Sequence, residues 1–326
     1  MQSAQTIKDA QEPSRNLKKS AVWISVILGV ALSGTGLAHA DDLLGQGRFL
    51  ATGGIQSLDG AAGGGINPWA VIAGYGTNEQ INPTASFTNV TLPDFSVSQI
   101  GVSVGIFNRL ELSYAYQTGT LGSNVFNKNG TVALPLDGMK IGQHVFGAKV
   151  RLFGDAVYNS NNFIPQVALG VEYKKADTDS NALVPALQSL GAGVKDHGTD
   201  VYLSATKVLI GGFFGYNWLL NGNLRYTKAN ETGLLGFGGV NHNSGHLKPE
   251  FSTAVLLRPD VAVGYEYKGI SNNLSDAGLK QSSWQDVFVA YFPNKNVSLA
   301  LAFAKLGNVG PYTNQNGIYA NATVSF

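Results

Sequence analysis

The last ten residues of the chain, Gly317 to Phe326, alternate in polarity over their whole length. One face of an extended strand would carry Ile318, Ala320, Ala322, Val324 and Phe326, and the other Tyr319, Asn321, Thr323 and Ser325. A period of two residues predicts a strand in a sheet whose two faces meet different surroundings. The fold is therefore constrained to a β architecture with one apolar and one polar face.

The same strand closes with an aromatic residue at the free carboxylate. This ending resembles the assembly signal of bacterial outer-membrane barrels, which makes Val324 and Phe326 candidate assembly-signal residues. In such a barrel the apolar face of each strand meets lipid and the polar face meets the lumen. The alternative is the last strand of a soluble β domain.

The N-terminal region has the pattern of a secretory signal. Lys18 and Lys19 precede an apolar run from Ala21 to Leu32, and Ala38-His39-Ala40 follows. These features predict export through the Sec pathway and cleavage after Ala40. The apolar run is too short for a spanning helix, which needs roughly 18 apolar residues. An exported chain without such a helix crosses a membrane only as a closed barrel, so we expect the Gram-negative outer membrane.

Charge and cysteine content narrow the possible partners. The chain has 22 Lys and Arg residues against 21 Asp and Glu residues, and no cysteine. Near neutrality argues against a nucleic-acid partner, and the lack of cysteine excludes disulfides and thiolate metal sites. We expect instead outer-membrane lipid and lipopolysaccharide, the barrel-assembly machinery, periplasmic chaperones and a small solute as partners.

The predicted organisation has three parts: a signal peptide over residues 1–40, a Gly-rich segment over residues 41–66 and a barrel over residues 67–326. The Gly-rich segment contains TGGIQSLDGAAGGGI, which is too rich in Gly for a lipid-facing strand and lacks the Lys-Ser/Thr ending of a phosphate loop. We expect a plug in the lumen, where Gln56, Ser57 and Asp59 meet inward basic residues. A flexible tether and an extra strand over Phe49 to Ile55 are the alternatives.

Twelve strands are expected in the barrel. They span Trp69 to Thr77, Val97 to Ile106, Leu110 to Gln117, Ile141 to Phe153, Phe163 to Lys175, Thr199 to Leu209, Asn217 to Lys228, Leu247 to Leu257, Val261 to Ile270, Ser283 to Phe292, Val297 to Leu306 and Gly317 to Phe326. Short turns alternate with longer polar loops, the first of them Asn78 to Ser96. This pattern predicts an antiparallel up-and-down transmembrane β-barrel with both termini in the periplasm.

Ionisable residues occupy the polar faces of these strands. The lumen-facing candidates are Glu111, Lys149, Arg151, Glu172, Lys174, Arg225, Glu250, Glu266, Lys268 and Asp286. A Lys or Arg placed toward lipid near the bilayer midplane would cost about 2 to 4 kcal/mol, so these side chains face the lumen. Lys149 and Arg151 share one face of their strand, and Glu172 and Lys174 share one face of the next strand, so cross-strand ion pairing is geometrically possible. Such charges either line a channel or fill a closed barrel.

Several sequence segments carry information beyond the alternation of polar and apolar residues. GIFNRLELSYAYQT, GQHVFGAKVRLFGDAV, LLNGNLRYTKAN and WQDVFVAYFPNKNVSLALAFAKLGN resemble an uncharacterised Gram-negative family, the domain of unknown function family 3034. The resemblance covers almost all of the chain after residue 40. It implies an outer-membrane-barrel-like protein, and it supplies no activity or site residues.

Motifs for catalysis or metal binding are weak. His242 and His246 lie four residues apart, but Asn243, Ser244 and Gly245 between them predict a loop instead of a helix with both rings on one face. No nucleophile motif surrounds any serine, as a hydrolase would need. We therefore expect a non-enzymatic barrel without metal or cofactor, acting as a narrow channel for passive or substrate-selective uptake of small solutes. A closed structural or surface-interaction barrel and an outer-membrane hydrolase are the alternatives.

Overall fold

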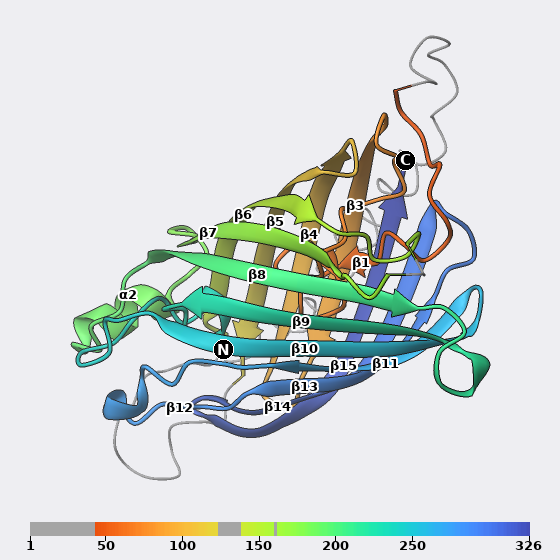
Figure 1. The fold of residues 1–326 in the computed structure, drawn as a ribbon. Coiled ribbons are helices and arrows are strands. Elements are labelled where there is room, and N and C mark those ends of the chain that lie inside the picture. The colour runs from red at the N-terminus through yellow and green to blue at the C-terminus, as the bar shows by residue number, and fades with distance from the viewer. Residues whose placement is uncertain (1–42, 123–137, 160–161) are drawn as a thin grey trace, which may run out of the picture. The chain divides into compact units, whose positions relative to one another are not determined.

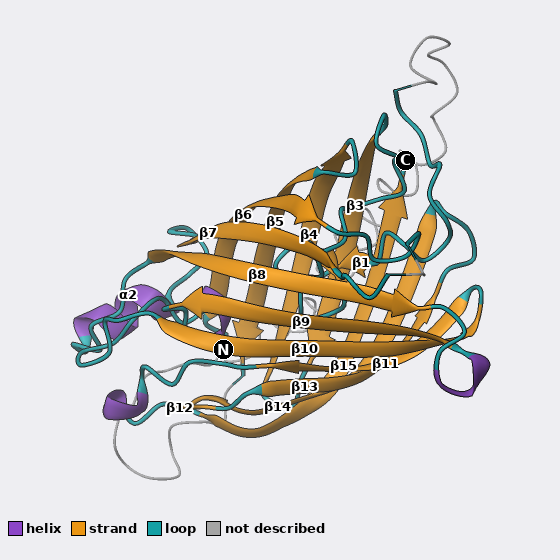
Figure 2. Cartoon of the chain, viewed as in Figure 1, coloured by secondary structure: helices purple, strands orange, loops and turns teal. Residues whose placement is uncertain are grey.

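The computed structural model describes residues 43–122, 138–159 and 162–326, so the predicted signal peptide lies outside the described residues. Within the described part, twelve long antiparallel strands form a closed barrel (Figures 1 and 2). This confirms the predicted fold class and strand number. No helix in the described residues is long and apolar enough to cross a membrane.

The wall strands are connected in sequence order, and the last one pairs with the first. They are β3 (Ile81–Thr91), β4 (Phe95–Ile106), β5 (Leu110–Leu121), β6 (Lys140–Phe153), β7 (Gln166–Ala176), β8 (His197–Leu209), β9 (Asn217–Thr227), β10 (His246–Arg258), β11 (Val261–Lys268), β13 (Trp284–Tyr291), β14 (Val297–Gly310) and β15 (Tyr312–Ser325). Smaller elements are β1 (Ile55–Gln56), β2 (Ala62–Gly63), β12 (Lys280–Gln281), α2 (Leu183–Ser189) and the 3₁₀ turns Phe213–Gly215, Glu231–Gly233 and Ser275–Ala277.

Closure of the barrel depends on β15, which pairs with β14 on one side and β3 on the other. Its two faces are those that the sequence predicts. Tyr319 and Asn321 are buried inside the barrel, whereas Ile318 is 49% exposed on the outside. Beyond β15, the Phe326 N–H donates to the Pro83 carbonyl at 3.0 Å and so fastens the C-terminus to the first wall strand.

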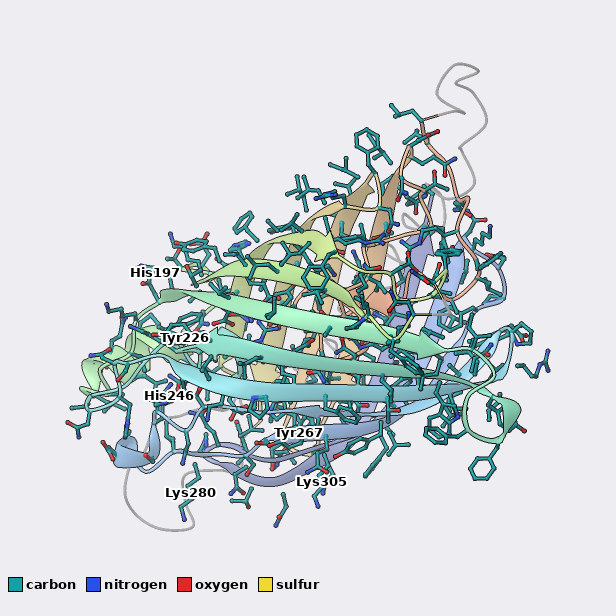
Figure 3. All side chains as sticks on the ribbon, viewed as in Figure 1. His197, Tyr226, His246, Tyr267, Lys280 and Lys305 are labelled. Atoms are coloured by element: carbon teal, nitrogen blue, oxygen red, sulfur yellow. The ribbon has the colours of Figure 1, made fainter. Side chains whose placement is uncertain are left out.

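The outer surface of the wall is apolar in its middle and aromatic at its ends. Exposed apolar side chains there include Val171, Leu203, Leu224, Phe251, Val287, Leu301 and Ile318. Figure 3 shows His197, Tyr226 and His246 on the neighbouring strands β8, β9 and β10, toward the end that carries α2. An apolar band bordered by aromatic side chains is the surface that a barrel presents to a bilayer.

The two ends of the barrel differ in their connections. At the end where β3 begins and β15 stops, which we call the short-turn end, β4 and β5 are joined by residues 107–109, and β10 and β11 by residues 259–260. The opposite end, the α2 end, carries longer connections such as residues 177–196 and 228–245. Figure 1 shows α2 and the C-terminus at these opposite ends.

The predicted alternation of short and long connections is wrong at two places on the α2 end. Residues 92–94 are a tight turn between β3 and β4, and Pro311 alone separates β14 from β15. The first is short because β3 forms inside the predicted loop, and the second is short because β14 and β15 are longer than predicted. β14 continues to Gly310 through register shifts next to Gly307, which are β-bulges that keep it paired with β15.

The predicted first strand, Trp69 to Thr77, is also wrong. Residues 69–76 are buried, and no strand forms there. The first wall strand is β3, which lies inside the predicted loop Asn78 to Ser96. Its Pro83 is tolerated because it lies near the start of the strand, where the ladder with β15 ends at the pair Thr84 and Ser325.

Candidate functional site

A continuous buried stretch, residues 52–76, fills the middle of the barrel; we call it the luminal segment. Its only regular structure is the small β1–β2 ladder, in which Ile55 pairs with Gly63. The segment extends ten residues beyond the predicted Gly-rich part, and Phe49 to Ile55 does not form an additional wall strand. Side chains on the inner face of the wall contact this segment from most of the strands, so it lies within the lumen.

Glycine is required where the segment touches the wall. A Cβ atom on Gly64 would lie 2.1 Å from Glu266 Oε1, and one on Gly65 would lie 3.2 Å from the ring of Tyr319. The side-chain-free backbone therefore reaches a wall carboxylate directly. The Glu266 carboxylate accepts hydrogen bonds from the Gly65 N–H at 2.6 Å and the Ile66 N–H at 3.0 Å.

A second wall contact joins an ion pair to the backbone of the segment. Lys149 Nζ lies 2.9 Å from Glu111 Oε2, and both side chains are fully buried. Glu111 accepts from the N–H groups of Ala62 and Ala73, at 3.0 and 2.9 Å. Lys149 donates to the carbonyls of Ala62 and Trp69, at 3.0 and 3.1 Å. The pair thus supplies partners to the Ala62 and Ala73 N–H groups and the Trp69 carbonyl, and a second donor to the Ala62 carbonyl, which also accepts from the Trp69 N–H at 3.1 Å.

Neutral side chains anchor the rest of the segment. The Asn67 side-chain amide donates to the Phe251 and Tyr267 carbonyls at 3.0 and 2.9 Å, although these two residues belong to the wall ladder. The Ala70 N–H donates to Thr206 Oγ1 at 2.8 Å. Gln56 Nε2 lies 2.8 Å from Thr84 Oγ1 and also donates to Ser103. The segment is therefore held on several sides by side chains that recognise peptide groups.

Asp59 is the charged side chain of the segment that enters the wall network. Its carboxylate lies 3.1 Å from Lys174 Nζ and 3.3 Å from Lys268 Nζ. Burial alone would raise the pKa of Asp59, but these two cations outweigh burial and hold the pKa well below its usual value. The carboxylate is therefore ionised at any physiological pH and ties the segment to β7 and β11.

The wall charges form a connected group on β7 to β11. Arg225 lies 2.6 Å from Glu172 and 2.6 Å from Glu250, and its guanidinium stacks on the Tyr202 ring at 4.9 Å. Lys174 lies 3.2 Å from both Glu172 and Asp200. These charges are tolerated inside the barrel because each cation contacts more than one carboxylate.

The structure brings nine of the ten predicted lumen-facing charges together as buried side chains and leaves one apart. Arg151 lies at the short-turn end, where it pairs with the partly exposed Asp155 at 3.0 Å. Lys149 and Glu172 do not form a cross-strand pair, because the register places Lys149 opposite Gly170. Among the plug candidates, Gln56 and Asp59 make the contacts given above, and Ser57 is buried.

Asp200 is a buried charge that the sequence reasoning missed. It lies on the inner face of β8, two residues before Tyr202 and four before Ser204, which are also buried. The alternation along β8 was therefore sufficient to predict its orientation. Asp286 was predicted, and it lies opposite Glu266 in the β11–β13 register. Neither of its carboxylate oxygens has a hydrogen-bond partner within the described residues.

An enclosed apolar cavity lies on the α2 side of the luminal segment; we call it the chamber. It measures about 60 Å³. Leu58 and Ile66 of the segment line one side. Its other lining residues are Val90, Leu92, Phe95, Val97, Leu121, Ile141, Leu183, Leu187, Glu231, Leu234, Leu235, Leu279, Trp284, Ala304, Leu306, Val309, Pro311, Tyr312 and Tyr319. The sequence reasoning missed this cavity.

Glu231 is an unusual member of this lining. It is buried in the connection 228–245, and Trp284 Nε1 donates to one of its oxygens at 3.1 Å. Burial raises the pKa of Glu231 well above its usual value, because no cation offsets the lost hydration. Burial thus favours the neutral form of this side chain, which can donate as well as accept a hydrogen bond.

A larger and more open cleft lies at the short-turn end; we call it the mouth cleft. It has a volume of about 570 Å³. Thr52, Trp69 and Val71 of the luminal segment line its inner side, and Val208, Leu219 and Leu256 line the wall side. The luminal segment thus contributes residues to both cavities and lies between them.

Hydroxyl, imidazole and carboxylate side chains lie close together near β5 and β6. Ser180 donates to Asp177 at 2.6 Å and lies 3.0 Å from the Tyr116 hydroxyl, whereas His144 is hydrogen-bonded to Tyr114. The Ser180 and Tyr116 hydroxyls lower the pKa of Asp177 to about 2. Within the described residues, no group of three or more His, Asp or Glu side chains could hold a metal ion.

No curated protein matches the chain, whereas several solved structures are similar to it. Solved structures that are similar include the KdgM porin (TM-score 0.43, 11% identity, 74% of this chain and 99% of that chain) and LpxR from Salmonella typhimurium (0.43, 11%, 75% and 99%). A third is an outer membrane channel from Pseudomonas putida F1 (0.40, 10%, 80% and 97%). The family described as "Protein of unknown function (DUF3034)" matches residues 52–323, and the chain belongs to this family.

Proposed function

We propose that this barrel is an outer-membrane channel for small solutes, closed in the present structure by its luminal segment. The observation that supports this most is the position of the segment between two cavities. Leu58 and Ile66 line the chamber, and Trp69 and Val71 line the mouth cleft. Movement of one segment would therefore join the two cavities into a path.

The way in which the segment is held also favours a channel over a closed structural barrel. A barrel that only needs a filled interior is stabilised equally well by apolar side chains, because buried ion pairs gain little over apolar packing. Here the wall instead presents Glu111, Lys149 and Glu266 to peptide groups. These contacts can be replaced one by one by water, whereas interlocked apolar side chains would leave a void.

We further propose that the short-turn end faces the periplasm, since short turns face that side in barrels of this kind. Epitope tags placed between Asn181 and Val194, or between Gly269 and Gln281, are expected to be accessible on intact cells. A tag at Asn294 is expected to be inaccessible until the outer membrane is permeabilised. Surface labelling at Asn294 with protection of the other two sites would reverse the orientation.

The gate itself is tested with a disulfide lock, which the cysteine-free chain allows without background thiols. Ala70→Cys combined with Thr206→Cys would tie the luminal segment to β8, because the Ala70 N–H already contacts Thr206 Oγ1 at 2.8 Å. The control is Val171→Cys with Val201→Cys, a register pair on the lipid face of β7 and β8.

Planar-bilayer recordings supply the readout. The wild type is expected to open intermittently, and Asp59→Asn, which weakens the attachment to Lys174 and Lys268, is expected to open more often. The oxidised lock should remove openings, and dithiothreitol should restore them, with no effect on the control pair. If every folded variant is silent, the channel proposal fails. If the oxidised lock conducts like the wild type, the segment is not the gate.

A further inference from the structure

The chamber is enclosed by three different parts of the chain. Leu58 and Ile66 of the luminal segment form its floor, and the inner faces of wall strands form its sides. Its roof comes from connections at the α2 end, through Leu183 and Leu187 of α2, Leu234 and Leu235 of residues 228–245, and Leu279. An apolar cavity with this construction excludes ordered water, since water needs two or more polar partners.

One polar atom at the chamber is left without a partner. Glu231 Oε1 is buried and has no hydrogen-bond partner within the described residues. The other oxygen of Glu231 is fixed by Trp284, so the free oxygen cannot turn away without losing that bond. Buried polar groups are nearly always hydrogen-bonded, and an exception calls for an explanation such as an unoccupied ligand position.

We propose that the chamber is a binding site for a small, neutral, mostly apolar solute that carries one hydroxyl group, of the alkylphenol class. The apolar body of the solute fills the empty space among the leucine side chains, and its hydroxyl bonds to Glu231 Oε1. The lining contains no Lys, Arg or His among the described residues, so it offers no cation to an anionic solute. The inference deepens the proposed channel function by naming its solute class.

The size of the chamber implies that its roof moves on binding. Its volume of about 60 Å³ is smaller than the roughly 150 Å³ of an apolar cavity that accepts benzene. The roof is formed by connections between strands, whereas the floor and sides are formed by the luminal segment and the wall. Glu231 and Thr232 in that roof have positive φ angles, 45° and 59°, which are strained for residues other than glycine. The roof is therefore the part of the enclosure that we expect to move on binding.

Binding is measured by calorimetry on the full folded barrel in detergent, with p-cresol, toluene and 4-methylbenzoate as probes. These molecules share a methyl-substituted ring and differ in the polar group. p-Cresol is expected to bind at least about fivefold more tightly than toluene, since one buried hydrogen bond distinguishes them. 4-Methylbenzoate should show no saturable binding. Equal affinity for p-cresol and toluene would overturn the role of the hydroxyl.

Three variants locate the site. Glu231→Leu removes the free oxygen and should bring the affinity for p-cresol down toward that for toluene. Ala304→Phe fills the chamber from β14 and should abolish binding of both. Leu301→Phe, on the lipid face of the same strand, is the control and should leave both affinities unchanged. p-Cresol binding that survives Ala304→Phe in a folded barrel would move the site elsewhere.

The outcome separates this inference from the channel proposal. A barrel that conducts in bilayers but binds none of the three probes would refute the ligand site and leave the channel standing. A barrel that binds p-cresol in the predicted order but never conducts would refute the channel and keep the ligand site. The heat-modifiable gel mobility of each variant confirms that a negative result comes from a folded barrel.

Discussion

Two levels of one lumen differ sharply in chemistry. On β6, Lys149 faces the luminal segment, whereas Ile141 on the same face lines the chamber. On β5, Glu111 and Leu121 make the same contrast. The level that encloses a peptide chain is charged, because buried amide groups must find partners. The level that encloses empty space is apolar, and this difference indicates that each level is matched to what it holds.

The largest effect is expected from removing a charge at the level of the luminal segment. Lys149→Met leaves Glu111 buried without its cation and removes two bonds to the luminal segment. Loss of one partner of a buried ion pair costs about 3 to 5 kcal/mol, so urea unfolding in lipid vesicles should show a loss of that size. Arg151→Met is the matched control at the partly exposed pair with Asp155 and should cost no more than about 1 kcal/mol. Equal losses would mean that depth in the lumen is irrelevant.

The second largest effect is expected from enlarging the apolar chamber. Leu306→Ala enlarges the chamber and should lower the free energy of unfolding by about 2 to 4 kcal/mol, as buried Leu to Ala changes do. Leu301→Ala on the lipid face of the same strand leaves no internal cavity and should cost less in the same unfolding measurement. A larger loss for Leu301→Ala would show that the chamber residues are not well packed.

A third test sharpens the contrast through pH. Because the pKa of Glu231 is raised in the folded barrel, the folded state holds a proton that the unfolded chain releases. Stability is thus fully present below the unfolded pKa near 4.3 and falls as pH rises, by at most about 1.4 kcal/mol per unit. Glu231→Gln should flatten this slope between pH 5 and 8. An unchanged slope would assign the pH dependence to other groups.

The smallest effects distinguish two neighbouring residues of the luminal segment. Gln56→Ala removes bonds to Thr84 and Ser103 and should cost about 1 to 3 kcal/mol, because their partners remain buried. The Ser57 hydroxyl has no hydrogen-bond partner among the described residues, so Ser57→Ala should change the free energy of unfolding by less than about 0.5 kcal/mol. A cost for Ser57→Ala equal to that of Gln56→Ala would contradict these contacts.

Period-two alternation was sufficient to predict most of the wall and its inward charges. Alternation did not predict β3, whose sequence INPTASFTNVT combines a proline with Asn, Thr and Ser. Those polar residues form the inner face, where Thr84 bonds to Gln56 and Thr88 to Asn321. Conversely, the apolar run after Trp69 has the composition of a strand but is buried inside the barrel. Composition does not distinguish a wall strand from a segment that the wall encloses.

The chamber could not be predicted from the sequence for a different reason. Its roof residues, such as Leu187 and Leu234, come from connections without periodicity, and they meet only in the folded barrel. The sequence did predict that Asp59 would contact basic side chains, since a lone acidic side chain among inward-facing Lys and Arg residues has few other partners. Which bases it meets depends on the path of a backbone that has little regular structure, and pattern analysis carries no information on that path.

The wall carboxylates and the Lys149 ammonium bind the luminal segment mainly through its N–H and C=O groups. Water offers the same donors and acceptors as a peptide group. A lumen built to hold backbone is therefore also a lumen that wets readily, and departure of the segment would leave a hydrated pore instead of a collapsed one. Opening would exchange one set of hydrogen bonds for another, so the barrier to flow would lie in the apolar chamber, where water finds only the free oxygen of Glu231.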